Sequence, residues 1–245
     1  MQPIPGIHPI TAIASDPQAN VDLYHTAENR LHRDQPVYTA GERLSNAWAA
    51  MVLIHGRGAS ASDILLLGEQ LYHPQFAYLA PQAAGNTWYP YSFLAPIEQN
   101  EPWLSSALET VEAVIRQVED AGVDASRIVV GGFSQGACLA SEFVARNPRR
   151  YGGLIMFSGG LIGPPGGLRE YTGTLDGTPV FLGCSDVDPH IPKERVLESA
   201  RILEDLGGDV TYRLYPGLGH TVNRDEIDRA RAIVRAVTTS SSAVG

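Results

Sequence analysis

A serine flanked by glycines is the first feature of the sequence that could do chemistry. Residues 132–136 have the sequence Gly-Phe-Ser-Gln-Gly, the Gly-x-Ser-x-Gly pattern that holds a serine on a sharp turn between a strand and a helix. The glycines are needed because the backbones beside the serine approach so closely that side chains at 132 and 136 would collide. An apolar, β-branched run precedes the motif and small residues follow it, so we predict that Ser134 is a nucleophile. A glycine-rich turn with an incidental serine is the alternative.

A serine hydroxyl is a weak nucleophile at neutral pH. It needs a histidine that takes its proton and an acid that holds the histidine in the right tautomer. His220 lies in the glycine-rich loop 216–221 after a predicted strand, and we predict that it is the base; an ordinary surface histidine is the alternative. Asp186 and Asp188 follow another predicted strand. One of them should be the acid, and the residues alone do not choose between the two.

Acyl transfer to a serine passes through an intermediate with a negative oxygen, which needs hydrogen-bond donors. Residues 55–58 have the sequence His-Gly-Arg-Gly and follow a predicted strand, where the first donor is expected. We predict that the backbone N–H groups of Arg57 and Gln135 converge on this oxyanion, each contributing about 3 kcal/mol in the transition state. The guanidinium of Arg57 could also bond a carbonyl or acidic group of the substrate; a solvated loop arginine is the alternative.

These residues need a scaffold, and the hydropathy pattern indicates which one. From about residue 48 onward, apolar runs of strand length alternate with segments of helical period. This alternation predicts an α/β fold with a mostly parallel central sheet and helices on both faces. The candidate strands are 48–54, 76–80, 127–131, 154–157, 180–183 and 210–215.

Apolar residues at spacings of three and four predict four helices. The last helix begins with Asn223 and Glu226 in capping-box spacing. The inward-facing residues of the four helices are Leu104, Leu108, Val111, Ile115 and Val118; Ala137, Ala140, Phe143 and Val144; Val196, Ala200 and Leu203; and Ile227, Ala230, Val234 and Val237.

Two long segments interrupt the alternation and are candidates for shaping a site. Residues 81–103 are rich in aromatic residues and proline, and residues 159–171 are rich in glycine and proline. Long loops in α/β proteins tend to carry binding surfaces. We therefore expect Trp88, Tyr89 and Leu161 to contact the substrate. Anchoring of the aromatic loop to the core is the alternative.

The composition is typical of one soluble globular domain, since 44% of the 245 residues are hydrophobic and 18% are charged. A formal net charge of −9 with scattered basic residues opposes binding to nucleic acid or anionic lipid. No apolar run is long enough to cross a membrane, and the first residues do not have the pattern of a secretory signal. We therefore expect a cytoplasmic location.

Further expectations concern domain limits, cysteines and cofactors. We expect an N-terminal extension over 1–35, either partly disordered or forming an added strand. One domain over 36–238 and a flexible tail over 239–245 should follow. Cys138 and Cys184 have no partner at metal-ligand spacing and are expected to be buried thiols. We expect neither a metal nor a cofactor.

Together these motifs resemble the phospholipase/carboxylesterase family of small α/β-hydrolases, which also includes acyl-protein thioesterases. The resemblance implies an α/β-hydrolase fold with a minimal cap domain or none, with Ser134 as nucleophile and His220 as base. It selects Asp188 as the acid, because in this family the acid precedes Pro-x-(Val or Ile)-Pro. It also implies hydrolysis without a cofactor. The similar segments are residues 53–58, 80–82, 87–89, 132–136, 188–192 and 219–220, within a stretch of about 48–237.

The His-Gly-Arg-Gly segment and the long insertion over 81–103 look most like bacterial members associated with hydroquinone or aromatic catabolism. Arg57 and Cys184-Ser185 differ from the residues of thioesterase members. We therefore predict a serine carboxylesterase that hydrolyses short-chain carboxylic esters through an acyl-enzyme. The substrate is expected to be a small molecule. The alternatives are a lysophospholipase or acyl thioesterase, and a catalytically silent homologue that binds an aromatic ligand or a partner. A homodimer is left open.

Residues 6–24 resemble a different kind of protein, the opening strand and turn of ring-cleaving dioxygenases of the vicinal-oxygen-chelate type. The dioxygenase pattern has a second histidine where Pro9 stands, and no later segment supplies further metal ligands. We interpret the segment as a remnant or an appended piece, not as a metal site. It suggests neighbouring genes for the degradation of aromatic rings, which mapping the locus would test.

Overall fold

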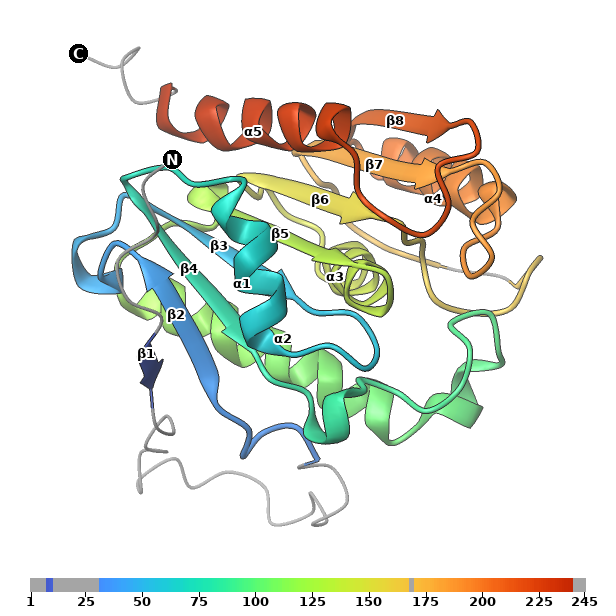
Figure 1. The fold of residues 1–245 in the computed structure, drawn as a ribbon, viewed down its shortest axis with the longest axis horizontal. Coiled ribbons are helices and arrows are strands. Elements are labelled where there is room, and N and C mark those ends of the chain that lie inside the picture. The colour runs from blue at the N-terminus through green and yellow to red at the C-terminus, as the bar shows by residue number, and fades with distance from the viewer. Residues whose placement is uncertain (1–7, 11–30, 168–169, 240–245) are drawn as a thin grey trace.

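The computed structural model describes residues 8–10, 31–167 and 170–239 (Figure 1). Most of the segment that resembles a dioxygenase, and all of the expected tail except Thr239, lie outside these residues. None of the described helices combines the length and the hydropathy that a membrane span requires.

The described strands form a single eight-stranded sheet with the order β1-β2-β4-β3-β5-β6-β7-β8. Neighbours from β4 to β8 are parallel, whereas β2 pairs antiparallel with both β1 and β4 at one edge. The expectation of a mostly parallel sheet is confirmed. The strands are β1 (His8–Ile10), β2 (Val37–Gly41), β3 (Ala49–Ile54), β4 (Phe76–Pro81), β5 (Ile128–Phe133), β6 (Gly153–Phe157), β7 (Pro179–Ser185) and β8 (Asp209–Tyr215).

The six strands expected from the sequence are β3 to β8, and their observed ends differ from the expected ones by no more than two residues. The sequence pattern does not indicate β2. Among its residues only Ala40 is buried, and the others are partly exposed, so no continuous apolar run marks the strand. Its position follows from pairing with β4, in which Val37 lies opposite Pro81.

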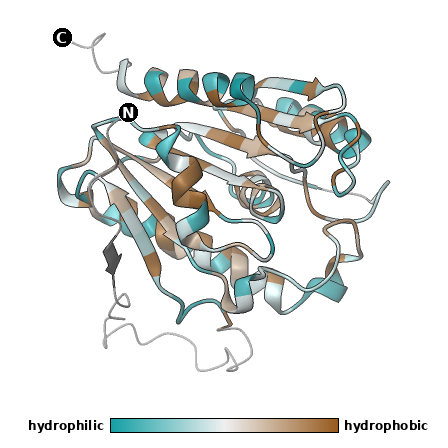
Figure 2. Cartoon of the chain, viewed as in Figure 1, coloured by the Kyte–Doolittle hydropathy of each residue, from teal (hydrophilic) through white to brown (hydrophobic). Residues whose placement is uncertain are grey.

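Helices cover both faces of the sheet, as expected (Figure 1). On one face pack α2 (Trp103–Asp120), α3 (Gln135–Arg146) and α4 (Lys193–Asp205); on the other pack α1 (Ala61–Glu69) and α5 (Arg224–Thr239). Figure 2 shows the hydrophobic colour along the central strands and on parts of the helices that cover them.

Strand β3 shows why both faces are apolar. Val52 and Ile54 belong to the buried cluster that includes α2, α3 and α4, whereas Met51 and Leu53 belong to the cluster that includes α1 and α5. Successive side chains of a strand point to opposite faces, so a strand covered on both faces must be apolar throughout. Burying each such side chain stabilises the fold by about 1.5–3 kcal/mol.

The capping box predicted at the last helix is confirmed. Asn223 N donates to the Glu226 carboxylate at 2.8 Å, and Glu226 N donates to Asn223 Oδ1 at 3.0 Å. Helix α1 is not indicated by the sequence pattern, although it begins with a capping box of its own between Ser60 and Asp63. Its run of apolar residues at 64–67 hides the helical period.

One residue of the expected N-terminal extension, His32, contacts the folded domain. His32 lies within the expected extension over 1–35, yet its side chain is fully buried. Its Nδ1 accepts a hydrogen bond from Ala84 N at 3.0 Å, and its Nε2 lies 3.0 Å from the carbonyl oxygen of Trp88. His32 therefore packs against the domain.

Candidate active site

Ser134 occupies the turn between β5 and α3. Its φ of 55° and ψ of −121° form a conformation that residues with a side chain rarely adopt. A Cβ at residue 132 would lie 2.5 Å from the carbonyl carbon of Gly136, and a Cβ at residue 136 would overlap the carbonyl oxygen of Ile54. The steric prediction for Gly132 and Gly136 is therefore confirmed.

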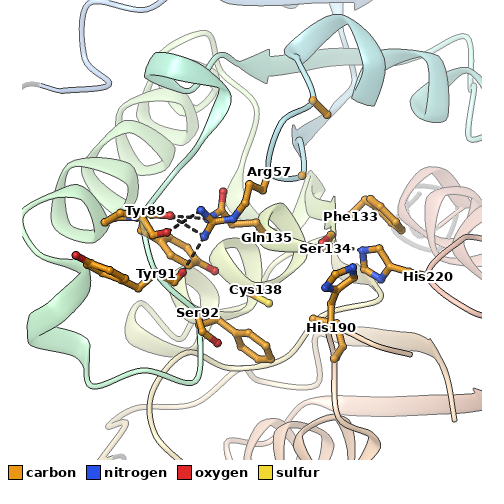
Figure 3. A pocket seen from close by; sticks show the side chains of 15 residues that line it. Arg57, Tyr89, Tyr91, Ser92, Phe133, Ser134, Gln135, Cys138, His190 and His220 are labelled. Carbon is orange, nitrogen blue, oxygen red and sulfur yellow. Dashed lines mark hydrogen bonds between the residues drawn. The ribbon is translucent and has the colours of Figure 1, made fainter. Parts of the chain in front are cut away.

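The side chains of Ser134, His220 and Asp188 meet at this turn. His220 Nε2 lies 2.9 Å from Ser134 Oγ (Figure 3), and His220 Nδ1 lies 2.7 Å from Asp188 Oδ2. An ionised carboxylate can only accept a hydrogen bond, so Nδ1 carries the proton and Nε2 faces the serine hydroxyl as an acceptor. This arrangement can transfer the hydroxyl proton to the imidazole when the serine attacks an electrophile.

Asp188 is held as an ionised acceptor. Its side chain is fully buried, and its Oδ1 accepts hydrogen bonds from His190 N at 2.8 Å and Ile191 N at 3.1 Å. Burial raises the pKa of Asp188, but the hydrogen bonds from His220 and the two amides outweigh burial and lower the pKa below its ordinary value. The carboxylate therefore stays charged at neutral pH and can stabilise an imidazolium at residue 220.

Asp186 has a different place. Its Oδ1 accepts a hydrogen bond from Gly217 N at 2.8 Å, and Oγ of the neighbouring Ser185 accepts one from Gly219 N at 3.0 Å. Both bonds tie the loop that carries His220 to the end of β7. Of the two aspartates, the structure brings Asp188 to the histidine and uses Asp186 as a loop anchor.

Two rings flank the imidazole of His220. The Phe133 ring centroid lies 4.9 Å away at an interplanar angle of 43°, and the His190 ring centroid lies 4.8 Å away at 73°. Figure 3 shows His190 beside His220 at the pocket. Packing on two sides limits rotation of the imidazole, which keeps Nε2 directed at Ser134.

The two predicted oxyanion donors come from adjacent parts of the sheet. Arg57 lies in the turn after β3, where Gly58 has a φ of 76° and donates its N–H to Asn86 O at 2.7 Å. Gln135 is the first residue of α3. The first N–H groups of a helix have no intrahelical acceptor and lie at the positive end of its dipole. The convergence of the two amides on an oxyanion stays a prediction.

The guanidinium of Arg57 is bonded within the protein. It donates to three backbone carbonyls of one loop: Tyr89 O at 2.9 Å, Pro90 O at 2.8 Å and Tyr91 O at 2.7 Å (Figure 3). Bonds to backbone carbonyls leave the guanidinium committed to the aromatic loop. Arg57 thus fixes one wall of the pocket that it also lines, and a contact of its side chain with the substrate stays a prediction.

Trp88 lies elsewhere than expected. Its side chain is fully buried, and its indole Nε1 donates to His55 O at 2.9 Å. Its backbone N donates to the side-chain oxygen of Gln135 at 2.9 Å, and the Gln135 amide donates to Tyr89 O at 2.8 Å. Trp88 thus anchors the aromatic loop to the core, which is the alternative that the sequence left open.

A pocket of about 500 Å³ opens beside Ser134 (Figure 3). Tyr89 lines this active-site pocket, as expected, whereas Leu161 does not. Leu161 is fully buried, and its backbone is held by hydrogen bonds from its N–H to Ser199 Oγ at 2.9 Å and from Arg195 to its carbonyl at 2.8 Å. The pocket is also lined by Tyr91, Phe93, Phe133, Cys138, His190 and Ile191.

Sequence reasoning missed two buried histidines that support the site. His55 Nδ1 lies 2.8 Å from Gly56 O, and its Nε2 accepts a hydrogen bond from Ala83 N at 3.0 Å. Together with His32 it flanks the indole of Trp88, at ring-centroid distances of 5.1 Å and 5.3 Å. Burial lowers the pKa of both histidines, so they are neutral at pH 7. Both histidines lie outside the periodic apolar segments, so the sequence pattern gives no sign that their side chains are buried.

Both cysteines are buried, as expected. Burial raises the pKa of Cys138 and of Cys184 to about 12, so neither is a thiolate at neutral pH. Cys138 lines the pocket one helical turn after Ser134 and is a poor nucleophile beside it. Among the described residues, no three side chains of histidine, cysteine, aspartate or glutamate form a group that could hold a metal ion.

Curated proteins similar to the chain include acyl-protein thioesterases. Acyl-protein thioesterase 1 of Gibberella zeae is 34% identical over 124 residues, which are 50% of this chain and 53% of that protein. The Saccharomyces cerevisiae protein of the same name is 29% identical over 53% of this chain and 58% of its own length. The chain thus spans little more than half of these two relatives. The Yarrowia lipolytica protein is 28% identical over 73% of this chain and 87% of its own length.

Among solved structures, a phospholipase/carboxylesterase from Dyadobacter fermentans is 44% identical, with a TM-score of 0.78, and the match covers 82% of this chain and 95% of that one. Esterase PE8 is 25% identical with a TM-score of 0.67, over 81% of this chain and 97% of that one. These likenesses confirm the α/β-hydrolase fold. The family profile described as Phospholipase/Carboxylesterase matches residues 42–238, and the chain therefore belongs to the phospholipase/carboxylesterase family.

Proposed function

We propose that the protein is a serine carboxylesterase that hydrolyses short-chain carboxylic esters through an acyl-enzyme. The observation that carries this proposal is the pair of hydrogen bonds that joins Ser134 to His220 at 2.9 Å and His220 to Asp188 at 2.7 Å. The active-site pocket beside Ser134 supplies room for a small substrate. Membership of the family and the names of the relatives agree with action on esters.

In the first step, His220 Nε2 takes the hydroxyl proton as Ser134 Oγ attacks the ester carbonyl carbon. The carbonyl oxygen becomes an oxyanion, which the N–H groups of Arg57 and Gln135 stabilise. Asp188 holds the resulting imidazolium through Nδ1. The bond to the alcohol oxygen then breaks, and His220 gives its proton to that oxygen, so that a neutral alcohol leaves and the acyl group stays on Ser134.

In the second step, a water molecule replaces the alcohol. His220 takes a proton from the water molecule while the water oxygen attacks the acyl carbon. The N–H groups of Arg57 and Gln135 stabilise the second oxyanion. When this intermediate collapses, the proton returns to Ser134 Oγ and the carboxylic acid is released. No redox change occurs, and the protein's own groups carry every proton transfer.

The test is a panel of esters that differ in acyl length, run with the native protein and with Ser134→Ala. We expect the highest kcat/KM for short acyl chains, because the pocket of about 500 Å³ is bounded by aromatic side chains. Ser134→Ala should lower kcat by about 10⁴-fold or more, since removing the nucleophile leaves only binding and the oxyanion donors. Hydrolysis that survives this substitution undiminished would contradict the proposal.

An acyl thioesterase is the second candidate, favoured by the names of the curated relatives. A lysophospholipase is the related alternative, and both would use the same triad on a longer acyl chain. An ester and a thioester of one acyl group, each in a short and a long version, separate these activities. A preference for the long thioester by kcat/KM would favour the second candidate.

A catalytically silent homologue that binds an aromatic ligand or a partner is the candidate from another class. The hydrogen-bonded triad argues against a silent homologue, because a site without catalysis does not need a serine, a histidine and an aspartate joined by hydrogen bonds. A fluorophosphonate probe tests this directly. Absence of label at Ser134, with folding shown by circular dichroism, would favour the silent homologue.

The remaining features of the proposal concern the setting of the enzyme. We propose a small-molecule ester as substrate and a cytoplasmic location. We also propose that neither nucleic acid nor a membrane is a partner, because the net charge of −9 opposes binding to nucleic acid and to anionic lipid. We also propose one catalytic domain over 36–238, preceded by an extension and followed by a tail. Sedimentation would show whether the protein is a homodimer.

A further inference from the structure

A second hollow adjoins the active-site pocket at His220. Its volume is about 480 Å³, and we call it the α1 groove. It shares Gly56, Ala59, Phe133 and His220 with the active-site pocket, so the two hollows are contiguous. Six residues line only the groove: Ile64, Leu67 and Val222 are apolar, whereas His55, Asp63 and Thr221 are polar.

The walls of the α1 groove are fixed parts of the fold. Ile64 and Leu67 are three residues apart on α1, so they project from the same face of that helix. The Ser60 capping box fixes the start of this helix. Val222, another residue of the groove lining, directly precedes the capping box of α5, which Asn223 and Glu226 close. These parts of the lining are thus built before a substrate binds.

The positions of the triad atoms assign a different half of an ester to each hollow. The leaving oxygen must lie within reach of His220 Nε2, which protonates it. His220 lines both hollows, and Thr221 and Val222, which follow it directly, line only the α1 groove. By contrast, Ser134, Gln135 and Cys138 line the active-site pocket and not the groove. The acyl carbon, bonded to Ser134 Oγ, therefore continues into the active-site pocket.

From this arrangement we infer that the α1 groove binds the alcohol part of the substrate, as a subsite for an apolar, uncharged leaving group larger than methyl. The inference rests on the proposed esterase function and adds its substrate class, which is esters with an aliphatic alcohol of several carbons. The acyl part and the alcohol part of such an ester would each occupy a separate hollow of the protein. Leu67 and Val222 are the residues that determine this specificity.

Charge at the groove supports an uncharged alcohol. Asp63 lies among the groove residues, and hydrogen bonds from the Ser60 side chain and backbone lower its pKa. The carboxylate is therefore ionised at neutral pH. An anionic leaving group, such as a phosphorylated alcohol, would be repelled there.

Leu67→Gln tests the inference, with Leu66→Gln as its matched control. Leucine and glutamine have similar helix propensities, so both variants should keep α1. Leu67 is partly buried and lines the groove, whereas Leu66 is 54% exposed and does not line it. Methyl butanoate and hexyl butanoate are the substrates, because they share one acyl group and differ only in the alcohol.

We expect Leu67→Gln to lower the ratio of kcat/KM for hexyl over methyl butanoate by about tenfold, the size of a typical hydrophobic pocket contact. Leu66→Gln should leave the ratio unchanged. The decay of the butanoyl-enzyme, measured in a single turnover, should be the same in the native protein and both variants, because the alcohol has left by then.

Two results would overturn the inference while the esterase function stands. One is an unchanged ratio in Leu67→Gln; the other is a slower butanoyl-enzyme decay or an altered acyl-length preference in that variant, which would place the acyl group in the groove. Failure of the esterase function itself looks different, since then the native protein would show no Ser134-dependent hydrolysis of either butanoate.

Discussion

At Ser134 the chemistry depends on contacts that hold each neighbouring side chain in one orientation and one protonation state. His220 is packed between Phe133 and His190, and the buried carboxylate of Asp188 accepts from its Nδ1. The two amides that bond the other oxygen of Asp188 keep it from rotating. Each contact narrows the rotamers that the imidazole can adopt, so little reorganisation is needed when the serine attacks.

Asp188→Asn tests this account of the acid. An asparagine amide can donate a hydrogen bond to Nδ1, which stabilises the tautomer whose Nε2 carries a proton and cannot accept one. We expect kcat for ester hydrolysis to fall by about 10⁴-fold, with a much smaller change in KM. Steady-state kinetics at pH 7 to 8 measures both parameters.

Asp186→Asn is the control for that substitution. The anchor at 186 needs only an acceptor for Gly217 N, and the asparagine carbonyl oxygen keeps one. We expect a far smaller loss of kcat than in Asp188→Asn. Equal losses in the two variants would contradict the assignment of Asp188 as the acid.

At the scale of elements, the site depends on a loop that is held from two sides. The guanidinium of Arg57 bonds three carbonyls of the segment 89–91, and the Gln135 side chain bonds Trp88 N and Tyr89 O. Arg57 and Gln135 are also the residues whose amides are proposed to stabilise the oxyanion. The same two residues thus connect the reacting centre to the wall of the pocket.

Arg57→Lys should loosen that wall without removing the amide of residue 57. A lysine ammonium cannot reproduce the planar fork that reaches three carbonyls, and hydrogen bonds to charged groups contribute about 1.5–3 kcal/mol each. We expect KM to rise by about tenfold and kcat to change less. Arg127→Lys is the control, because Arg127 bonds Trp48 O and Gly122 O and does not line the pocket. A fall in kcat alone in Arg57→Lys would contradict this role.

Elements were predictable where a local pattern determines them. β3 to β8 are buried apolar runs, and the glycines at 132 and 136 follow from the steric needs of one turn. Side-chain partners across the chain were not predictable. The bonds of Arg57 to a loop more than thirty residues away could not be predicted, because no local pattern encodes which carbonyls the fold brings near a guanidinium.

At the scale of the whole molecule, the parallel sheet brings distant segments together. Ser134 follows β5, Asp188 follows β7 and His220 follows β8, and the carboxyl ends of parallel strands lie at one edge of a sheet. Chain order and strand direction therefore made the meeting of these residues predictable. Trp88 and Leu161 show the limit of such reasoning, since a loop position does not reveal whether a side chain turns to the pocket or to the core.

The same packing buries a carboxyl group that links stability to pH. Glu226 is fully buried, and its Oε1 has no hydrogen-bond partner among the residues that the structure describes. Burial raises the pKa of Glu226 from 4.5 to about 7. The folded state then holds this proton more tightly than the unfolded state does, so the stability from this group is complete below pH 4.5 and is lost as the pH rises to about 7.

Glu226→Gln should remove that pH dependence. The quantity to compare is the free energy of unfolding of the native protein minus that of the variant. This difference should fall by up to about 3 kcal/mol as the pH rises from 4.5 to 7. The buried His32 and His55 are common to both proteins, so their contribution cancels in the difference. Urea denaturation at several pH values measures it, and parallel stability curves for the two proteins would contradict the burial of an ionisable group at 226.

In the proposed mechanism, Ser134 forms a covalent acyl-enzyme with a proton relay through His220 and Asp188. The most direct measurement is mass spectrometry of the protein quenched in acid during turnover of a butanoate ester, followed by peptide mapping. We expect one butanoyl group per chain, on the peptide that contains Ser134 and on that serine. A butanoyl group on Cys138 or another residue, or turnover with no acylated protein in either the native protein or Asp188→Asn, would contradict it.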